Sequence, residues 1–272
     1  QFVVACFAQN CLDLVALDLA VALRGLCSVV VSGQEQLLNA LELLGSGRCA
    51  VVSGPPRSLG AQGAAAAWEG EDAGTLFTLF CTSGSTGVSK LVRRTRAAWL
   101  DIARDTAQFG THLCVTLTFS SLAHSGPRTE LWWNLACGGQ TALADASLPI
   151  LESLEALSPT EVAAPPSVWA EVRRSFAGAG ASEPKRLKRS YPGLLRRLHS
   201  VSTGSARCDP DLFRFMQGVF GKEVSVSDNY GSTEVGAIAT DGVVNFNVKA
   251  KLIEIPELGI KFPRGEICVK CE

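Results

Sequence analysis

The sequence lacks several patterns on which common classes of enzymes and binding proteins depend. Its 25 Lys and Arg residues are balanced by 26 Asp and Glu residues, so no overall basic field exists to attract nucleic acid. There is no Gly-x-Ser-x-Gly turn of the serine-hydrolase type and no Gly-x-Gly-x-x-Gly loop of the dinucleotide-binding type. A carrier-protein serine motif and internal repeats are also missing, and the absence of repeats excludes a solenoid.

Histidine is scarce, which limits the metal sites that the chain can form. The only histidines are His112, His124 and His199. The ten cysteines have no regular spacing, and several interrupt apolar segments, which is typical of a protein from a reducing compartment. The one Cys-x-x-Cys pair, Cys268 and Cys271, has no second pair to complete a zinc site. We interpret this pair as part of a strand rather than as a zinc or redox site.

The longest apolar stretch runs from Leu12 to Val31 and carries three charged residues, Asp13, Asp18 and Arg24. Each charge would cost a few kcal/mol at the centre of a bilayer. We therefore expect an amphipathic helix over residues 12–23 and a strand over residues 28–31, not a membrane span. No targeting segment is visible, and we expect a protein that is cytoplasmic or peripheral to an intracellular membrane.

Basic residues gather in and after the Gly-containing stretch 178–193, which we expect to be a flexible loop. They are Lys185, Arg186, Lys188, Arg189, Arg196 and Arg197. A solvated loop and helix face explains this cluster. Contact with an anionic membrane surface or an acidic partner protein is the functional alternative, for which the sequence holds no further evidence.

Strand-like and helix-like segments alternate along the chain. The predicted strands span residues 2–8, 28–31, 49–52, 76–81, 113–119, 140–144 and 160–163. The predicted helices span residues 12–23, 37–44, 93–109, 129–136 and 148–156. This alternation predicts an α/β fold of parallel sheets covered by helices, with ligands bound at the carboxyl ends of the strands.

The most informative segment follows the apolar run 76–81 and ends at a lysine. Its residues are Thr82, Ser83, Gly84, Ser85, Thr86, Gly87, Val88, Ser89 and Lys90. Glycines let backbone N–H groups turn toward an anion, hydroxyls donate to phosphate oxygens, and the lysine adds a positive charge. The segment therefore predicts a phosphate-binding loop, although taken alone an ordinary polar turn has the same composition.

A second motif, Tyr230-Gly231-Ser232-Thr233-Glu234, follows the alternating segment 223–227. An aromatic ring beside a glycine can stack on a flat base, and Thr233 can reach a phosphate. Glu234 supplies the hard oxygen ligand that Mg²⁺ prefers. A tight turn with a capping glutamate would also fit, but two such motifs in one chain favour a nucleotide site.

Together these segments resemble the adenylate-forming (AMP-binding) enzyme superfamily of acyl-CoA synthetases, luciferases, and the adenylation domains of peptide synthetases and carboxylic acid reductases. Residues 82–90 resemble its phosphate loop, and residues 230–234 its adenine and magnesium motif. Residues 122–124 (Leu-Ala-His) are similar to the motif whose histidine lies beside the acid. Residues 202–206 (Ser-Thr-Gly-Ser-Ala) resemble the lining of the adenine and acyl pocket, and residues 265–270 the strand that closes the large domain.

The resemblance implies an AMP-forming acid–thiol ligase. It would activate a carboxylic acid, here a fatty acid, with ATP to an acyl-adenylate, releasing pyrophosphate, and then form a thioester as long-chain fatty acid–CoA ligases do. The implied cofactors are ATP and Mg²⁺, with CoA or phosphopantetheine as the thiol acceptor. The implied partners are a small carboxylic acid and CoA or a carrier protein, with no nucleic acid.

The resemblance also assigns roles to residues. The catalytic set is Lys90, His124, Thr233 and Glu234, of which Glu234 is the Mg²⁺ ligand. The nucleotide-binding set is Thr82, Ser83, Gly84, Ser85, Thr86, Gly87, Ser205, Ala206, Asn229, Tyr230, Gly231 and Ser232. The substrate-pocket set is His124, Trp169 and Gly204, although a purely structural role for His124 stays open.

Two other interpretations remain open. Residues 231–259 and 263–266 look more like carboxylic acid reductases, whereas residues 122–124 and 166–169 look like long-chain acyl-CoA synthetases. A non-catalytic nucleotide-binding relic is the alternative from another class, because Ser89 and Leu91 stand where the family has Pro and Gly. The lost Pro makes the loop less pre-organised, and a Leu at a positive φ would strain the backbone.

The resemblance also bears on domain organisation. It covers nearly the whole chain, but no counterpart of the family's ribose-binding Asp, hinge or lysine-bearing lid follows. We expect residues 1–272 to be an incomplete adenylation domain that is truncated at both ends and lacks the small C-terminal lid.

Overall fold

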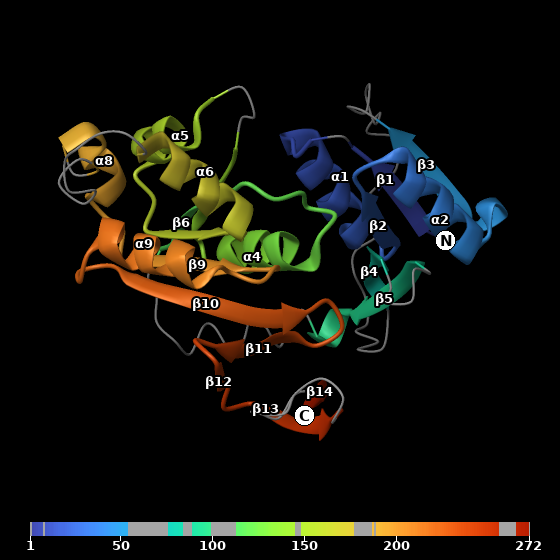
Figure 1. Ribbon diagram of the computed structural model, residues 1–272. Coiled ribbons are helices and arrows are strands. Elements are labelled where there is room, and N and C mark those ends of the chain that lie inside the picture. The colour runs from blue at the N-terminus through green and yellow to red at the C-terminus, as the bar shows by residue number, and fades with distance from the viewer. Residues whose placement is uncertain are drawn as a thin grey trace. The chain divides into compact units, whose positions relative to one another are not determined.

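The computed structural model describes residues 2–7, 9–53, 76–83, 89–98, 113–144, 148–176, 187, 189–255 and 265–271. The chain divides into two compact units, residues 1–148 and 149–272 (Figure 1). Each unit combines sheets with helices, so the predicted α/β class is confirmed.

The main sheet of the first unit has five strands in the order β3-β1-β2-β4-β5. These strands are β1 (Phe2–Cys6), β2 (Cys27–Val31), β3 (Cys49–Ser53), β4 (Leu76–Ser83) and β5 (Ser89–Thr95). The first four are parallel, as predicted, while β5 runs antiparallel to β4. The antiparallel edge strand makes β4 and β5 a hairpin.

Helices cover both faces of this sheet because its central strands are apolar on both sides. Helix α1 (Leu12–Leu23) packs against Val3 and Ala5 of β1 and against Phe7, which follows the strand. Helix α2 (Gln34–Leu44) covers the opposite face, on which Val4 lies. A short 3₁₀ helix, residues 46–48, links α2 to β3.

The first unit also contains a parallel pair, β6 (Val115–Thr118) and β7 (Gln140–Leu143), joined through helix α4 (Ser125–Ala136). The fully buried Asn134 fastens the helix to this pair. Its amide nitrogen donates to the Gln140 carbonyl and the Thr141 hydroxyl, each at 2.8 Å.

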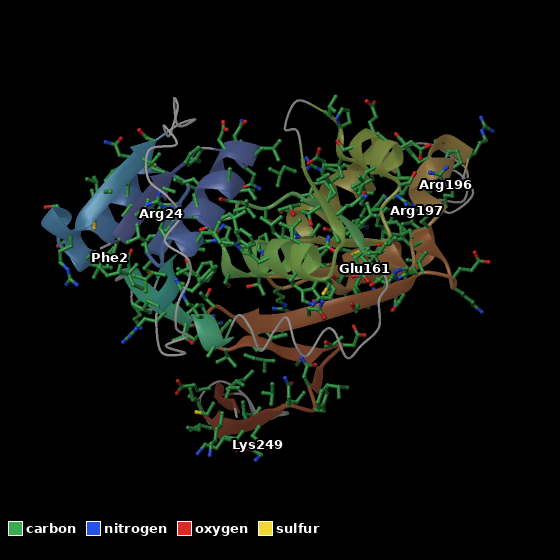
Figure 2. All side chains as sticks on the ribbon, turned by 180° about the vertical axis from the view of Figure 1, so that it is seen from behind. Phe2, Arg24, Glu161, Arg196, Arg197 and Lys249 are labelled. Carbon is green, nitrogen blue, oxygen red and sulfur yellow. The ribbon has the colours of Figure 1, made fainter. Side chains whose placement is uncertain are left out.

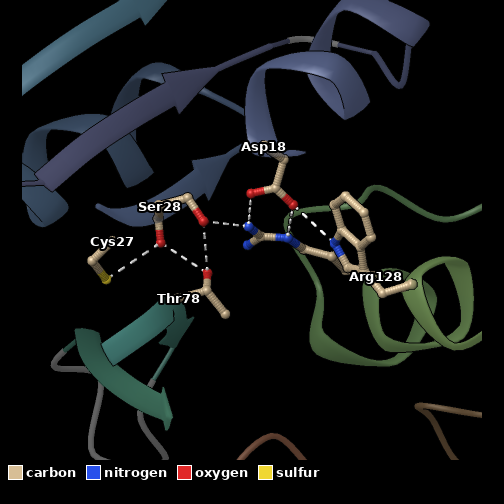
Figure 3. Close-up of polar contacts among 6 residues, drawn as sticks. Asp18, Cys27, Ser28, Thr78 and Arg128 are labelled. Carbon is tan, nitrogen blue, oxygen red and sulfur yellow. Dashed lines mark hydrogen bonds and ion pairs between the residues drawn. The ribbon is translucent and has the colours of Figure 1, made fainter. Parts of the chain in front are cut away.

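A buried ion pair joins α4 to α1 and to the main sheet (Figure 3). The Arg128 guanidinium donates to both carboxylate oxygens of Asp18 and, at 2.6 Å, to the Ser28 hydroxyl. The Trp132 indole N–H also donates to Asp18, at 3.0 Å. Beside this network, burial raises the pKa of the Cys27 thiol to about 11, so the thiol stays protonated at neutral pH.

The second unit has a five-stranded sheet in the order β12-β11-β10-β9-β8. Strands β8 (Glu161–Ala164), β9 (Ser200–Gly204) and β10 (Ser225–Ser232) are parallel, and β11 (Gly236–Thr240) and β12 (Val243–Val244) are antiparallel additions. Its helices are α5 (Ile150–Leu157), α6 (Pro166–Phe176), α8 (Pro192–Leu195) and α9 (Pro210–Phe220). A separate hairpin pairs β13 (Val248–Glu254) with β14 (Gly265–Cys271), so Cys268 and Cys271 lie in one strand, as interpreted from the sequence.

One predicted helix is correct only in part over the residues that the structure describes, because residues 96–98 are helical but residues 93–95 are not. The segment 93–109 was expected to be helical, but residues 93–95 belong to β5, since pairing with β4 satisfies their backbone groups. Helix α9 has no counterpart among the predicted elements, although its sequence carries clear signals. Asp209 caps its first turn by accepting from the Asp211 and Leu212 N–H groups, and Pro210 begins it.

Two arginines of the predicted basic cluster have a local structural role in the second unit (Figure 2). Arg197 donates to the Ser158 and Leu157 carbonyls at the end of α5, and Arg196 approaches the Ser158 hydroxyl. Glu155 in turn accepts from the Gly193 and Leu194 N–H groups. These hydrogen bonds join α5 to the segment of α8 and the residues that follow it. Among the described residues, no helix combines the length and apolarity that a membrane span requires.

Candidate active site

The predicted phosphate loop, residues 82–90, begins at the end of β4 and ends in β5. Thr82 pairs with Lys90, and Ser83 with Ser89, in the last paired register positions of the two strands. Thr82 is half-buried and Lys90 is exposed. The other loop residues assigned above, residues 84–87, lie outside the described part of the chain.

The two unusual residues after the loop fit the hairpin without strain. Leu91 pairs with Cys81 in the strand, and the described non-glycine residues with positive φ are Ser158, Ser205 and Asp241. Leu91 therefore has no positive φ, which is the condition under which strain would arise there. The Ser89 hydroxyl accepts a 2.9 Å hydrogen bond from the Asn39 side chain of α2, which anchors the strand at the position where the family has Pro.

His124 stands at the start of α4, in the turn that follows β6. Its φ and ψ of −85° and 147° make it the N-cap residue, and its side chain is exposed. The turn is held locally because the His124 N–H donates to the Ser121 carbonyl and the Ala123 N–H to the Ser121 hydroxyl. Leu122 and Ala123 are buried, so the backbone is anchored while the imidazole faces outward.

In the second unit, two predicted site segments meet at the carboxyl ends of β9 and β10. Gly204 pairs in register with Asn229, and a Cβ on Gly204 would come within 2.7 Å of the Asn229 carbonyl oxygen. Only glycine permits this approach of the two backbones. The next residue, exposed Ser205, has a φ of +66°, a left-handed conformation that concentrates at functional sites.

The Tyr230–Glu234 motif begins in β10 and ends in the turn to β11. The pairing of β10 with β11 shifts between Tyr230 and Gly231, as at a β-bulge, and bulges re-aim side chains near active sites. The Tyr230 side chain is 51% exposed, which leaves a ring face available for stacking. Glu234 is exposed, and Thr233 is half-buried in the same turn.

Two aspartates that the sequence patterns did not single out flank this motif. The Asp228 N–H donates to the Asp241 carboxylate at 2.7 Å, and the Asp241 N–H donates to the Asp228 carbonyl at 2.8 Å. Burial, followed by the nearby Asp241 charge, raises the pKa of the Asp228 carboxyl above its usual value. The Asp241-Gly242 dipeptide is a hairpin signal that predicts the turn but not its contact with β10.

Trp169 is fully buried in α6, behind the segment that lines the predicted pocket. Its indole N–H donates to the Ala164 and Ser202 carbonyls, both at 3.1 Å, and its ring meets Phe220 edge-on at 5.6 Å. From this position Trp169 packs behind β9 and holds it through the Ser202 carbonyl. Direct contact between Trp169 and the acid stays a prediction.

The structure thus groups the predicted site residues by unit. Thr82, Ser83, Lys90 and His124 belong to the first unit. Those of the second unit are Trp169, Gly204, Ser205, Ala206, Asn229, Tyr230, Gly231, Ser232, Thr233 and Glu234. The described residues contain no cluster of three or more His, Cys, Asp and Glu side chains suited to a metal. Glu234 would offer a cation one carboxylate, and substrate phosphates would complete its shell.

The close approach at Gly204 gives a testable consequence for stability. We expect Gly204→Ala to destabilise the second unit by about 1–3 kcal/mol, because the new methyl group pushes β9 away from β10. Chemical denaturation with a far-ultraviolet circular dichroism readout measures the change. Gly218→Ala is the matched control: it lies in α9, its Cβ meets nothing within 4 Å, and the exchange should stabilise by roughly 0.5–1 kcal/mol. Equal effects at both glycines would contradict the packing described here.

The sequence pattern of the AMP-binding enzyme family matches residues 46–270. The chain belongs to the AMP-binding enzyme family.

Individual relatives of this AMP-binding enzyme are carboxylic acid reductases. The chain is 28% identical over 222 residues to the carboxylic acid reductase of Mycobacterium tuberculosis. The matched region covers 72% of this chain and 19% of that protein. The adenylation domain of the carboxylate reductase from Mycobacterium chelonae has a TM-score of 0.75 at 24% identity, over 99% of this chain and 54% of that one. The corresponding domain from Segniliparus rugosus, in complex with AMP and a co-purified carboxylic acid, has a TM-score of 0.73 at 22% identity, over 100% and 56%.

The fold is that of the adenylation domain, as the sequence motifs predicted. The chain spans about a fifth of the length of the curated reductase that it matches and about half of the two solved domains.

Proposed function

We propose that this chain activates a carboxylic acid with ATP, forming an acyl-adenylate and releasing pyrophosphate. The observation that carries the proposal is the placement of the motifs. The phosphate loop, the His124 turn, the Gly204 segment and the Tyr230 motif each lie at or just after the carboxyl end of a strand that has a parallel neighbour. Ligands of α/β sheets bind at these ends. Membership of the AMP-binding family supports the same function.

The chemistry asks mainly for positioning and charge stabilisation. One carboxylate oxygen of the acid attacks the α-phosphorus of ATP in line, and the bond from that phosphorus to the bridging oxygen of pyrophosphate breaks. In the proposal, Thr82, Ser83, the 84–87 loop and Lys90 hold the β- and γ-phosphates. Thr233 reaches the α-phosphate, and His124 orients the acid.

The nucleotide base is assigned to the second unit. Tyr230 stacks on adenine, with Ser205, Ala206 and Asn229 around its edge, while Gly231 and Ser232 follow the bulge. Gly204 lets β9 approach β10 closely beside the proposed base site, and Trp169 holds β9 from behind by donating to the Ser202 carbonyl. Mg²⁺ held by Glu234 and the phosphates would neutralise charge on the leaving group.

For the thiol acceptor, the relatives favour a phosphopantetheine-bearing carrier over free CoA, because the curated relatives that match are carboxylic acid reductases. A fatty acid and CoA, as in long-chain fatty acid–CoA ligases, form the second candidate. The 122–124 and 166–169 segments favour it by their sequence. A comparison of acyl transfer to CoA and to a loaded carrier domain separates the two.

Lys90→Ala and Glu234→Gln test the nucleotide assignment. Mg²⁺-ATP at roughly 100 times its Kd should stabilise the wild-type chain by about 2.7 kcal/mol, seen as a rise in the melting temperature. Loss of the Lys90 charge removes a charge-assisted contact, so the Kd for ATP should rise roughly tenfold to a hundredfold. Glu234→Gln should abolish the dependence of this stabilisation on Mg²⁺, because the neutral amide is a poor ligand for the cation.

Lys222→Ala is the matched control, since Lys222 is also an exposed lysine but follows α9, away from both motifs in the sequence. It should leave the ATP-induced rise unchanged. Wild-type stabilisation that survives intact in both Lys90→Ala and Glu234→Gln would rule out these two assignments.

A further inference from the structure

Asn10 lies between β1 and α1, and its side chain contacts a loop that is distant in the sequence. Its amide nitrogen donates to the Ser120 carbonyl at 2.8 Å, and its amide oxygen accepts from the Leu122 N–H, also at 2.8 Å. Both ends of the amide are therefore used, which fixes its orientation. The two contacts span 110 and 112 residues of sequence.

This use of an asparagine is informative because the residue stands beside a helix start. Asparagine there ordinarily caps its own helix. Here the N-cap of α1 is Cys11, and it makes no side-chain cap hydrogen bond. The polar side chain is thus directed away from its own helix and toward the 120–122 loop.

The loop that Asn10 holds ends at His124. Between them, Leu122 and Ala123 are buried in the same apolar cluster as Phe7, which directly follows β1, and Leu14 of α1. Polar contacts from Asn10 and apolar contacts from Phe7 and Leu14 therefore hold the turn 120–124 together, and we call this set of contacts the clamp. The clamp fixes the backbone at the N-cap of α4, while the His124 side chain remains exposed.

We propose that Asn10 is a positioning residue that sets the orientation of His124 toward the acid. The inference rests on the proposed function for the role of His124, but the hold of Asn10 on the turn stands on the hydrogen bonds alone. Asn10 need not touch the substrate, since its effect passes through the Ser120–His124 backbone. A displacement of about 1 Å at a reacting group can lower a rate roughly a hundredfold.

The first test needs no activity. Because the chain has three histidines, a His124→Gln variant identifies the His124 imidazole signal in a nuclear magnetic resonance spectrum. In Asn10→Ala, we expect this signal to shift and the Leu122 amide to exchange with solvent at least about tenfold faster, because its acceptor is gone. Asn10→Asp keeps that acceptor but sets a carboxylate oxygen against the Ser120 carbonyl, so the Leu122 amide should stay protected while the His124 signal shifts, and this variant serves if the alanine variant folds poorly.

The second test uses acid-dependent exchange of pyrophosphate into ATP. Asn10→Ala should raise the KM for the acid or lower kcat roughly tenfold to a hundredfold, with the KM for ATP unchanged. Combining it with His124→Ala should add little to the loss caused by His124→Ala alone, because both changes remove one function. Gln36→Ala is the matched control: Gln36 holds the Ser32 backbone N–H and hydroxyl in the same unit and should leave the acid kinetics unchanged.

The outcomes separate the positioning role from the function. An unchanged His124 signal together with unchanged Leu122 exchange in Asn10→Ala overturns the proposal, as does an additive double variant or an equal kinetic effect in Gln36→Ala. If the wild-type chain does not exchange pyrophosphate into ATP, or if His124→Ala does so at the wild-type rate, the proposed role of His124 fails. The amide exchange and the imidazole signal would still decide whether Asn10 holds the turn.

Discussion

Asp18→Asn is expected to lower the free energy of unfolding of the first unit by about 3–5 kcal/mol. The variant leaves the Arg128 guanidinium buried without its counter-charge, and Arg128 is 1% exposed. The remaining contacts, to the Ser28 hydroxyl and over the Phe80 ring, do not neutralise the charge. Urea denaturation monitored by tryptophan fluorescence measures the loss, since Trp132 donates to the same carboxylate.

Asp13→Asn is the matched control for this change. Asp13 lies in the same helix but is exposed in its first turn, where a carboxylate contributes about 0.3–1 kcal/mol through the helix dipole. A double variant, Asp18→Leu with Arg128→Met, should recover much of the lost stability, because an apolar pair needs no charge compensation. Similar losses in Asp13→Asn and Asp18→Asn would contradict the description of a buried pair.

Trp169→Ala is expected to destabilise the second unit by about 3–5 kcal/mol. The indole is fully buried, packs edge-on against Phe220, and satisfies two carbonyl groups. Trp169→Phe keeps most of the ring but leaves the Ala164 and Ser202 carbonyls without this donor, so the loss should be about 1–3 kcal/mol. Thermal and urea denaturation of both variants give the order of stability.

The control for the tryptophan is an aromatic side chain outside the core. Phe246 is 93% exposed, and Phe246→Ala should change stability by no more than about 0.5 kcal/mol. If Trp169→Ala proved as mild as Phe246→Ala, the position of Trp169 behind β9 would be wrong. Reduced ATP binding in Trp169→Phe, with little unfolding, would support its role behind the predicted pocket.

The elements set by local pattern were predictable from the sequence. Helix α1 begins and ends where its apolar spacing predicted, and β2 and β3 differ from prediction by one residue. The resemblance of residues 82–90 and 230–234 to family motifs also predicted the family that the comparisons support. Local sequence is enough here because periodicity and loop composition are properties of short segments.

Features that depend on distant partners were not predictable. Asp18 served in the sequence only as evidence against a membrane span, because its partner Arg128 lies 110 residues away. Asn10 gave no signal for the same reason. Residues 93–95 were wrongly predicted to be helical, because no pattern in the local sequence indicates their pairing with β4. That Leu91 has no positive φ is likewise clear only once its strand partner is known.

Acid-driven exchange of labelled pyrophosphate into ATP tests the central claim most directly. With Mg²⁺ and a panel of carboxylic acids, the chain should incorporate label only when an acid of the right class is present, because exchange requires reversal of acyl-adenylate formation. Lys90→Ala and Glu234→Gln should lose most of that signal. ATP binding without exchange for every acid, or exchange that persists in both variants, would contradict the account, and the first of these results would identify a nucleotide-binding relic.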